Sequence, residues 1–320
     1  MEHLLYLPAY EGTLQEYDSP EDLMDFYKRL GCQGLEIIDC NDDPRSIVRP
    51  DAVVGLHLTF QACWLDFWRG DLDAVLAEFG SKQVIREFFG SLEPMSLVRQ
   101  YQKELDLAEA LGVKYVVFHV SEVSIDGVFT HRHRHEDSAV VDGAAEIINL
   151  ILAGREEKFD FLMENLWWPG LNLKDPAITR RLLDQVKYGR KGLMVDIGHL
   201  LHTNLDLTTE QDACSYVHRI LDQHEDLIPY MKGVHLHQTL SGQLVKDTLL
   251  DPPKLAEGYY QKFAQGYEQI GKVDSHLPFT NHCVTGLIDR IDPDYLVHEL
   301  MVKNRKHREE ALTQQRGLFI

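Results

Sequence analysis

Acidic and imidazole side chains recur at one kind of position in this 320-residue sequence. Each ends a short apolar, β-branched run, as in "FLMEN", where the run finishes on Glu164. A carboxylate beside an apolar interior is costly unless it binds a cation or takes part in proton transfer. The residues placed in this way are His57, His119, Glu164, Asp196, His235 and Glu299, and His199 follows Asp196 by three positions.

Histidine and carboxylate ligands together suit Zn²⁺, Mn²⁺ or a related divalent ion. No cysteine occupies these positions, which disfavours a structural zinc knot. A single histidine would more often be a half-buried, hydrogen-bonded residue, and Glu164 alone would equally suit an ordinary ion pair. The repeated pattern instead predicts one shared metal site. His237, two positions after His235, is predicted to point to the opposite face and to pack or to support the site.

The apolar runs alternate with segments of helical period, which predicts right-handed βαβ units around a parallel sheet. The helical patterns have recognisable ends, as in "SPEDLMDFYKRLG", where Ser19 can cap, Pro20 fits the first turn and Gly31 ends the helix. Other helices are expected at 97–111, 137–153, 175–186 and 208–221. The eight strand candidates are Leu4–Leu7, Gly34–Ile38, Ala52–Leu58, Tyr115–Val120, Phe159–Met163, Leu193–Val195, Gly233–Leu236 and Tyr295–Val297.

Eight βα units predict a single (β/α)₈ TIM-barrel domain of the α/β class over residues 1–320. The surplus length is expected in loop insertions at about 59–94 and 239–272, the second with an extra helix from Pro253 to Tyr267. A doubly wound sheet is disfavoured because no glycine-rich phosphate fingerprint follows the first strand. The C-terminal ends of all barrel strands converge, so the polar residues above should meet there.

Composition narrows the class of protein. Lys plus Arg is 32 and Asp plus Glu is 51, so the net charge of −19 disfavours nucleic acid as a partner. The basic residues of 303–308 suit the solvated face of a terminal helix. There is no run of about 20 apolar residues to cross a membrane. The five cysteines are odd in number and without a CxxC pair, which predicts a reducing, cytoplasmic compartment and no disulfide framework: Cys32, Cys40, Cys63, Cys214 and Cys283.

At these residues the sequence resembles the xylose isomerase-like barrel superfamily, which includes sugar isomerases and epimerases and the abasic-site nuclease endonuclease IV. The similarity runs from about residue 34 to 300 and rests on "GVKYVVFH", "MEN", "VDIGH", "VHLHQ", "DSH" and "HEL". In the isomerase and epimerase branch it implies one divalent ion held by Glu164, Asp196, His235 and Glu299. The endonuclease-like pattern adds a second ion at His57, His119 and Glu164, and a third at His199, Asp274 and His276.

Three functions are considered, of which the resemblance implies the first two and the third follows because a fold does not dictate function. The first is a metal-dependent isomerase or epimerase that acts on a small sugar or polyol by enediolate or hydride chemistry. Glu164 and Glu299 would then be its base and acid, and His199 would bind a hydroxyl. The second is a multi-zinc phosphodiesterase resembling endonuclease IV, and the third is a non-catalytic, metal-stabilised binding barrel. The expected ions are Mn²⁺ or Zn²⁺, one per chain for the isomerase or epimerase and up to three per chain for the phosphodiesterase.

Several aromatic and histidine residues leave alternatives open. Trp167 and Trp168 could stack on a sugar or pack over the barrel rim. His131, His133 and His135 in "THRHRHED" are interpreted as a polar loop before a helix that starts near residue 137, with a surface metal clamp as the alternative. Aromatic residues in the insertions weakly indicate a homodimer.

Overall fold

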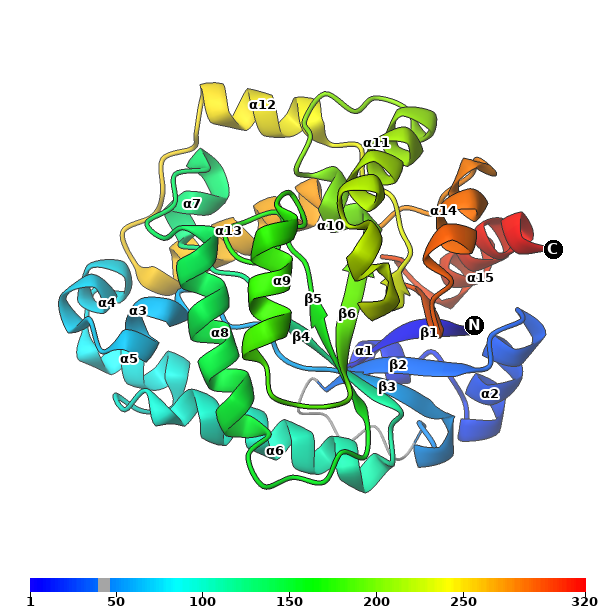
Figure 1. Cartoon of the computed structure of the whole chain (residues 1–320), viewed down its shortest axis with the longest axis horizontal. Coiled ribbons are helices and arrows are strands. Elements are labelled where there is room, and N and C mark those ends of the chain that lie inside the picture. Colours follow the sequence, from blue (N-terminus) through cyan, green and yellow to red (C-terminus); the bar gives the residue numbers. More distant parts are fainter. Residues whose placement is uncertain (40–46) are drawn as a thin grey trace.

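The computed structural model describes residues 1–39 and 47–320, and eight parallel strands in it form a closed barrel in chain order (Figure 1). The barrel closes where β8 pairs with β1, with Leu5 opposite His298. The predicted (β/α)₈ fold is confirmed, and each predicted strand is present. The strands are β1 (Glu2–Ala9), β2 (Gly34–Asp39), β3 (Val53–His57), β4 (Tyr115–His119), β5 (Asp160–Glu164), β6 (Lys191–Asp196), β7 (Met231–His235) and β8 (Tyr295–His298).

Helices follow the strands and cover the barrel (Figure 1). The predicted start of α2 is confirmed, because the Ser19 side chain accepts a hydrogen bond from the Asp22 backbone N–H and Pro20 is the first helical residue. The helices are α1 (Glu11–Leu14), α2 (Pro20–Arg29), α3 (Trp64–Arg69), α4 (Leu72–Phe79), α5 (Lys82–Phe89), α6 (Met95–Leu111), α7 (Ile125–Thr130), α8 (Asp137–Ile151), α9 (Pro176–Gln185), α10 (Ile197–Leu201), α11 (Glu210–Gln223), α12 (Gly242–Leu250), α13 (Tyr259–Val273), α14 (Cys283–Ile291) and α15 (Arg305–Arg316).

The strands carry apolar residues into the barrel interior and polar residues to its C-terminal end. Side chains two positions apart on a strand share a face, so one strand can do both. An apolar cluster that includes Leu4, Tyr115, Leu162, Met194 and Tyr295 fills the interior. On four strands an apolar inward residue comes two positions before a polar one: Val117 before His119, Leu162 before Glu164, Met194 before Asp196, and Val297 before Glu299.

Both predicted insertions contain helices. Residues 59–94 fold into α3, α4 and α5, which pack on one another, and 239–272 carries α12 and most of α13. Figure 1 shows α12 and α13 grouped with α7, and both helices contact it. The extra helix predicted from Pro253 instead begins at Tyr259, because adjacent prolines at 252 and 253 disfavour helical backbone and Gly258 is the N-cap.

A buried carboxylate fastens the first insertion to the barrel rim. Glu122, three residues after β4, accepts backbone hydrogen bonds from Trp64 (3.0 Å) and Leu65 (3.4 Å) at the start of α3. These N–H groups are orphan donors of the helix end, which Glu122 satisfies. Burial raises the pKa of Glu122 to about 8, although the two backbone hydrogen bonds lower it. The folded protein therefore holds a proton on Glu122 that the unfolded chain releases at a lower pH.

This raised pKa predicts a pH-dependent stability. The stabilisation is fully present below the ordinary pKa of 4.5 and is lost as the pH rises toward about 8. Glu122→Gln keeps an acceptor oxygen but removes the proton equilibrium. Between pH 5 and 8 the free energy of unfolding should fall less in the variant than in the parent. The difference should be a few kcal/mol, because each pKa unit corresponds to about 1.4 kcal/mol. Urea unfolding across that range measures it, with exposed Glu257→Gln as the control. Parallel curves for parent and Glu122→Gln would refute the assignment.

Three sequence expectations need correction or restriction at the outside of the barrel. Cys214 on α11 and Cys283 on α14 form a disulfide, with their Cα atoms 6.1 Å apart. The chain separates them by 69 residues, so only packing of the two helices brings them together. Cys32 and Cys63 are free, and Cys40 lies outside the described residues. Arg308 is not on a solvated face, since it is buried against Glu16 and Tyr17.

Over the described ranges, no helix has the length and apolar character needed to cross a membrane.

Candidate metal centre

The predicted ligands converge at the C-terminal end of the barrel. They form three groups in which the ligand atoms lie within 4.8 Å of one another. Glu164 belongs to two of the groups, which makes it the link between them. The groups are Glu164, Asp196, His235 and Glu299; His57, His119 and Glu164; and His199, His237, Asp274 and His276.

The first group surrounds one nitrogen of His235, and we call it the four-ligand cluster. His235 Nδ1 lies 3.0 Å from Glu164 Oε1, 3.0 Å from Glu299 Oε2 and 3.6 Å from Asp196 Oδ2. Glu299 is 7% exposed and the other three residues are fully buried. Three carboxylates therefore surround one ring nitrogen, His235 Nδ1, in a small buried volume.

Hydrogen bonds between strand ends hold this geometry. Asn165, directly after Glu164, accepts from the backbone N–H of Asp196 (2.9 Å) and donates to its carbonyl (3.0 Å). The Asp196 side chain in turn accepts from the His199 N–H (2.6 Å) and caps α10. The "MEN" and "VDIGH" motifs thus lock β5 to β6 and place His199 on a short helix directly above the strand.

The second group lies beside the first. Glu164 Oε2 is 3.0 Å from His57 Nε2 and 3.2 Å from His119 Nε2, and the two imidazole rings have centroids 4.7 Å apart. The other nitrogen of His57 lies 2.9 Å from the Leu58 carbonyl, which fixes the orientation of the ring. Glu164 thus directs one oxygen to each of two neighbouring groups.

The third group is built by the chain segment after α13. Asp274 Oδ2 lies 3.1 Å from His199 Nε2 and 2.8 Å from His276 Nε2, and Asp274 Oδ1 is 3.4 Å from His202 Nε2. His276 Nδ1 is 3.0 Å from the Glu299 carbonyl, so the third group is tied to the end of β8. The "DSH" motif therefore reaches the barrel mouth although a long insertion precedes it.

The predicted orientation of His237 is wrong. Residues two apart on an extended chain share a face, and His237 accordingly points to the same side as His235. Its ring stacks on His276 with centroids 3.8 Å apart, and its Nε2 lies 2.9 Å from Asp196 Oδ2. Gly198 makes room for this ring, since a Cβ there would come within 1.9 Å of His237 Cε1. The glycine of "VDIGH" is thus required by packing.

Two further residues of the site escaped the sequence reasoning. Glu36 on β2 is fully buried and lies 3.0 Å from His235 Nε2. Its signal was a single acid within the apolar run "GLEII", which the search for residues at strand ends passed over. His202 contacts Asp274, and its position three residues after His199 was the available signal.

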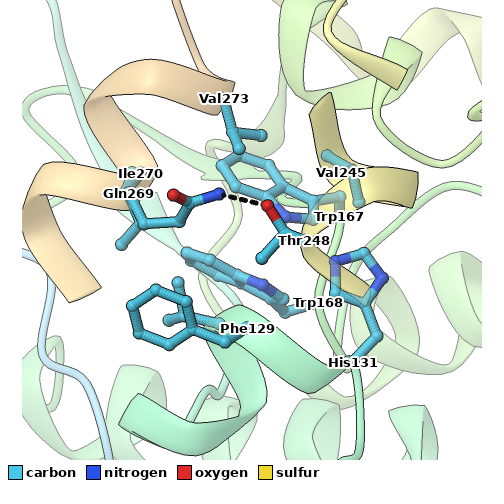
Figure 2. Close-up of a pocket in the computed structure, with 10 residues that line it drawn as sticks. Phe129, His131, Trp167, Trp168, Val245, Thr248, Gln269, Ile270 and Val273 are labelled. Atoms are coloured by element: carbon cyan, nitrogen blue, oxygen red, sulfur yellow. Dashed lines mark hydrogen bonds between the residues drawn. The ribbon is translucent and has the colours of Figure 1, made fainter. Parts of the chain in front are cut away.

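The two tryptophans behave differently. The Trp167 ring contacts His202 and His199, with centroids 4.4 Å and 5.4 Å away, whereas Trp168 is 3% exposed and stacks on Phe60. Figure 2 shows both rings lining one small cavity with Phe129 and His131, and a hydrogen bond from Gln269 to Thr248 at another wall. The cavity measures about 10 Å³, room for about one water. Residues from α12 and α13 complete its lining, so these insertions help to close the mouth.

The buried charges compensate one another. Burial opposes ionisation of Glu299, yet His235 and His276 hold its pKa at about 2, and burial of Glu164 is likewise outweighed by His119 and His235, which keep its pKa well below the usual range. Burial disfavours charge on His276, but Asp274 and Glu299 raise its pKa to about 9. His119 differs, since burial dominates and lowers its pKa to about 3. Divalent ions would replace the protons that now balance these carboxylates.

The residues present fit divalent ions. In the part of the chain that the structure describes, His119 Nδ1 and His237 Nδ1 are buried polar atoms without a hydrogen-bond partner, and Glu299 Oε2 makes no hydrogen bond although His235 Nδ1 lies 3.0 Å away. Such atoms cost about 1–3 kcal/mol each, which a cation bound at Glu299 Oε2 would offset. Imidazole and carboxylate donors without thiolate suit Zn²⁺ or Mn²⁺. Among the described residues, none of the three groups includes His131, His133 or His135. Those histidines lie before α8, which begins at Asp137 as predicted.

Comparison with known proteins identifies the family of this chain. Residues 24–312 match the family described as xylose isomerase-like TIM barrel, so the chain belongs to that family. None of the curated protein sequences matches it. The fold is shared with solved structures of low sequence identity, which support the architecture alone.

Three of these structures span almost the whole chain. A D-tagatose 3-epimerase-like protein is 13% identical with a TM-score of 0.52, and 99% of this chain and 98% of that chain are covered. The 3-keto-D-glucoside 4-epimerase YcjR from E. coli is 12% identical with a TM-score of 0.51, with 98% of both chains covered. The IOLI protein, described with a bound zinc atom, is 13% identical with a TM-score of 0.52, and 100% of this chain and 96% of that chain are covered.

The packing of Gly198 against His237 predicts a sharp glycine requirement. Gly198→Ala should destabilise the protein by about 1–3 kcal/mol, because the added methyl overlaps a buried ring. Gly286→Ala on α14 is the matched control, since nothing lies within 4 Å of a Cβ there. That change should stabilise by about 0.5–1 kcal/mol through helix propensity. Urea unfolding of the chelator-treated protein measures both, and equal stability of Gly198→Ala and parent would contradict the packing argument.

Proposed function

We propose that this chain is a divalent-metal-dependent isomerase or epimerase of a small sugar or polyol. The observation that carries the proposal is the four-ligand cluster, where Glu164 and Glu299 each place an oxygen 3.0 Å from His235 Nδ1 in a buried pocket of the barrel mouth. Glu164, Asp196, His235 and Glu299 would hold one ion. The chemistry that a bound divalent ion supplies there is polarisation of a substrate carbonyl.

Glu164 and Glu299 supply the proton-transfer groups of this proposal. The low pKa of each keeps it ionised at neutral pH, as a base requires. In the proposed epimerisation, one carboxylate would take up the proton next to the carbonyl, and the other, first protonated by solvent, would deliver its proton to the opposite face of that carbon. Proton exchange with solvent would then restore the starting protonation states. His199 lies within 3.4 Å of Glu164 and would bind a substrate hydroxyl through Nε2, in exchange for its 3.1 Å contact with Asp274.

Enclosure of the site supports a small substrate. The cluster residues are buried, and the Trp167 ring covers the edge of His199 and His202. Burial lowers the local dielectric constant, which strengthens the electrostatic interactions on which proton transfer depends. The apolar ring of Trp167 suits the C–H face of a sugar, whereas the deeper burial of Trp168 favours its alternative role in rim packing. The names of the epimerases with this fold agree with a carbohydrate substrate.

Glu299→Gln tests the acid–base role. Turnover should fall by roughly 10²–10⁴-fold, because the amide cannot exchange a proton, while the circular dichroism spectrum stays unchanged. The assay incubates a panel of ketohexoses and ketopentoses with the Mn²⁺- or Zn²⁺-loaded protein in D₂O. Epimerisation and deuterium uptake at the carbon next to the carbonyl are followed by NMR.

The exposed Glu225→Gln serves as the control and should retain parental turnover. Full activity of Glu299→Gln would remove this residue from the mechanism. If the fully metal-loaded parent turns over neither sugars nor phosphate esters, the non-catalytic binding barrel replaces both catalytic candidates.

A multi-zinc phosphoesterase is the second candidate, and the two additional ligand groups favour it specifically. His57 and His119 would share Glu164 for a second ion, and His199, Asp274 and His276 would hold a third. The chemistry that clustered ions supply is activation of water and neutralisation of phosphate charge. The net charge of −19 and the enclosed mouth favour a small phosphate ester over a nucleic acid.

Metal stoichiometry separates the two candidates. Elemental analysis of the protein after saturation with Zn²⁺ and removal of excess ion should give one ion per chain for the isomerase or epimerase. Three ions per chain would favour the phosphoesterase. His57→Gln should leave a one-ion protein unchanged, whereas a three-ion protein should lose one ion. The homodimer and the cytoplasmic location stay predictions.

A further inference from the structure

A carboxylate inside the barrel contacts the metal centre from below. Glu36 on β2 is fully buried and faces inward, between the apolar interior and the four-ligand cluster. His235 Nε2 lies 3.0 Å from Glu36 Oε1 and 3.1 Å from Oε2. Within residues 1–39 and 47–320, His235 is the ion-pair partner of Glu36. Such a charge is costly to bury, so its contacts need a reason.

The second contact of Glu36 is the hydroxyl of Tyr115. Tyr115 is the first residue of β4, and its hydroxyl donates to Glu36 Oε2 at 2.7 Å from within the barrel. The neighbouring strand β3 makes space for the ring, because a Cβ on Gly55 would lie 2.2 Å from Tyr115 Cζ. Glu36, Gly55 and Tyr115, on three neighbouring strands, therefore pack together directly beneath His235.

The two nitrogens of His235 face different partners. Nε2 faces both oxygens of Glu36 and therefore carries a hydrogen, since the Tyr115 hydroxyl has already donated its own to Oε2. Nδ1 faces the oxygens of Glu164, Glu299 and Asp196. A histidine whose one nitrogen donates to a carboxylate offers the lone pair of the other nitrogen to a metal.

We propose that Glu36, held by Tyr115, is a positioning residue that fixes the tautomer and orientation of His235, so that the Nδ1 lone pair points into the four-ligand cluster. The inference rests on the proposed function only in that a divalent ion binds there. The polar contacts of Glu36 are with His235 and with the Tyr115 hydroxyl. Glu36 acts through His235 by orienting the ring and raising the basicity of Nδ1.

The test is metal affinity, with Co²⁺ and Zn²⁺ as the ions. Glu36→Gln preserves side-chain volume but can also present an N–H to His235. We expect the affinity of the four-ligand cluster to fall by roughly 10- to 100-fold. Competition with a chelator measures the affinity, and the visible spectrum of bound Co²⁺ should change because the ligand geometry changes. Loss of stability without a change in affinity or spectrum would make Glu36 merely structural and overturn the proposal.

A pair of tyrosines gives the matched control. Tyr115 and Tyr295 lie in the same interior cluster with ring centroids 4.3 Å apart, but the Tyr295 hydroxyl bonds to Asp160 at 3.3 Å and not to Glu36. Both changes to Phe remove one buried hydroxyl. Tyr115→Phe should weaken metal binding, and Tyr295→Phe should leave it at the parental value. Equal effects of the two changes would contradict the proposal.

A measurement on the parent protein covers the case in which Glu36→Gln does not fold. Imidazole ¹⁵N NMR of the Zn²⁺-loaded parent should show His235 protonated at Nε2 and unprotonated at Nδ1. The opposite tautomer would overturn the proposal. If Glu36→Gln loses metal affinity but the parent does not turn over sugars, this inference is supported and the proposed function is wrong. If the parent turns over sugars but Glu36→Gln keeps the parental metal affinity, the proposed function is supported and this inference is wrong.

Discussion

The burial of many ionisable groups in one place is the constraint on which this structure depends. Glu164, Asp196, His235 and Glu299 are at most 7% exposed, so none can rely on water to stabilise its charge. Each carboxylate instead has an imidazole close by, and each imidazole a carboxylate or carbonyl. Removing a single member would leave an uncompensated buried charge. The shared position of Glu164 extends this dependence from one ligand group to the next.

The closed barrel keeps these charged groups apart from the apolar interior. The same strands that carry the polar groups at their C-terminal ends also place apolar side chains in the interior below them. The alternation of side chains separates the two environments by one inward-facing layer. Glu36 is the exception, since it lies where apolar residues predominate and depends on His235 and Tyr115. Gly55 and Gly198 supply the space that these oriented rings require.

The insertions decide what can reach the site. Residues of α12 and α13 meet Trp167 and Trp168 over the mouth, and the cavity between them accommodates about one water. The fold alone would permit other chemistry, because function lies in the site and its access. The insertions α12 and α13 therefore contribute to the surroundings of the site, in addition to the eight βα units.

The sequence by itself determined the eight strands, the barrel and seven candidate ligands, because local periodicity and the ends of apolar runs are encoded in neighbouring residues, whereas Asp274 and His276 were implied by the family resemblance. Tertiary structure decided the rest. Only packing showed that His237 faces the site and that Glu36 contacts His235 from another strand. It also paired Cys214 with Cys283 across 69 residues. These contacts join positions far apart in the chain, and no local pattern records which inward-facing side chains will touch after the barrel closes.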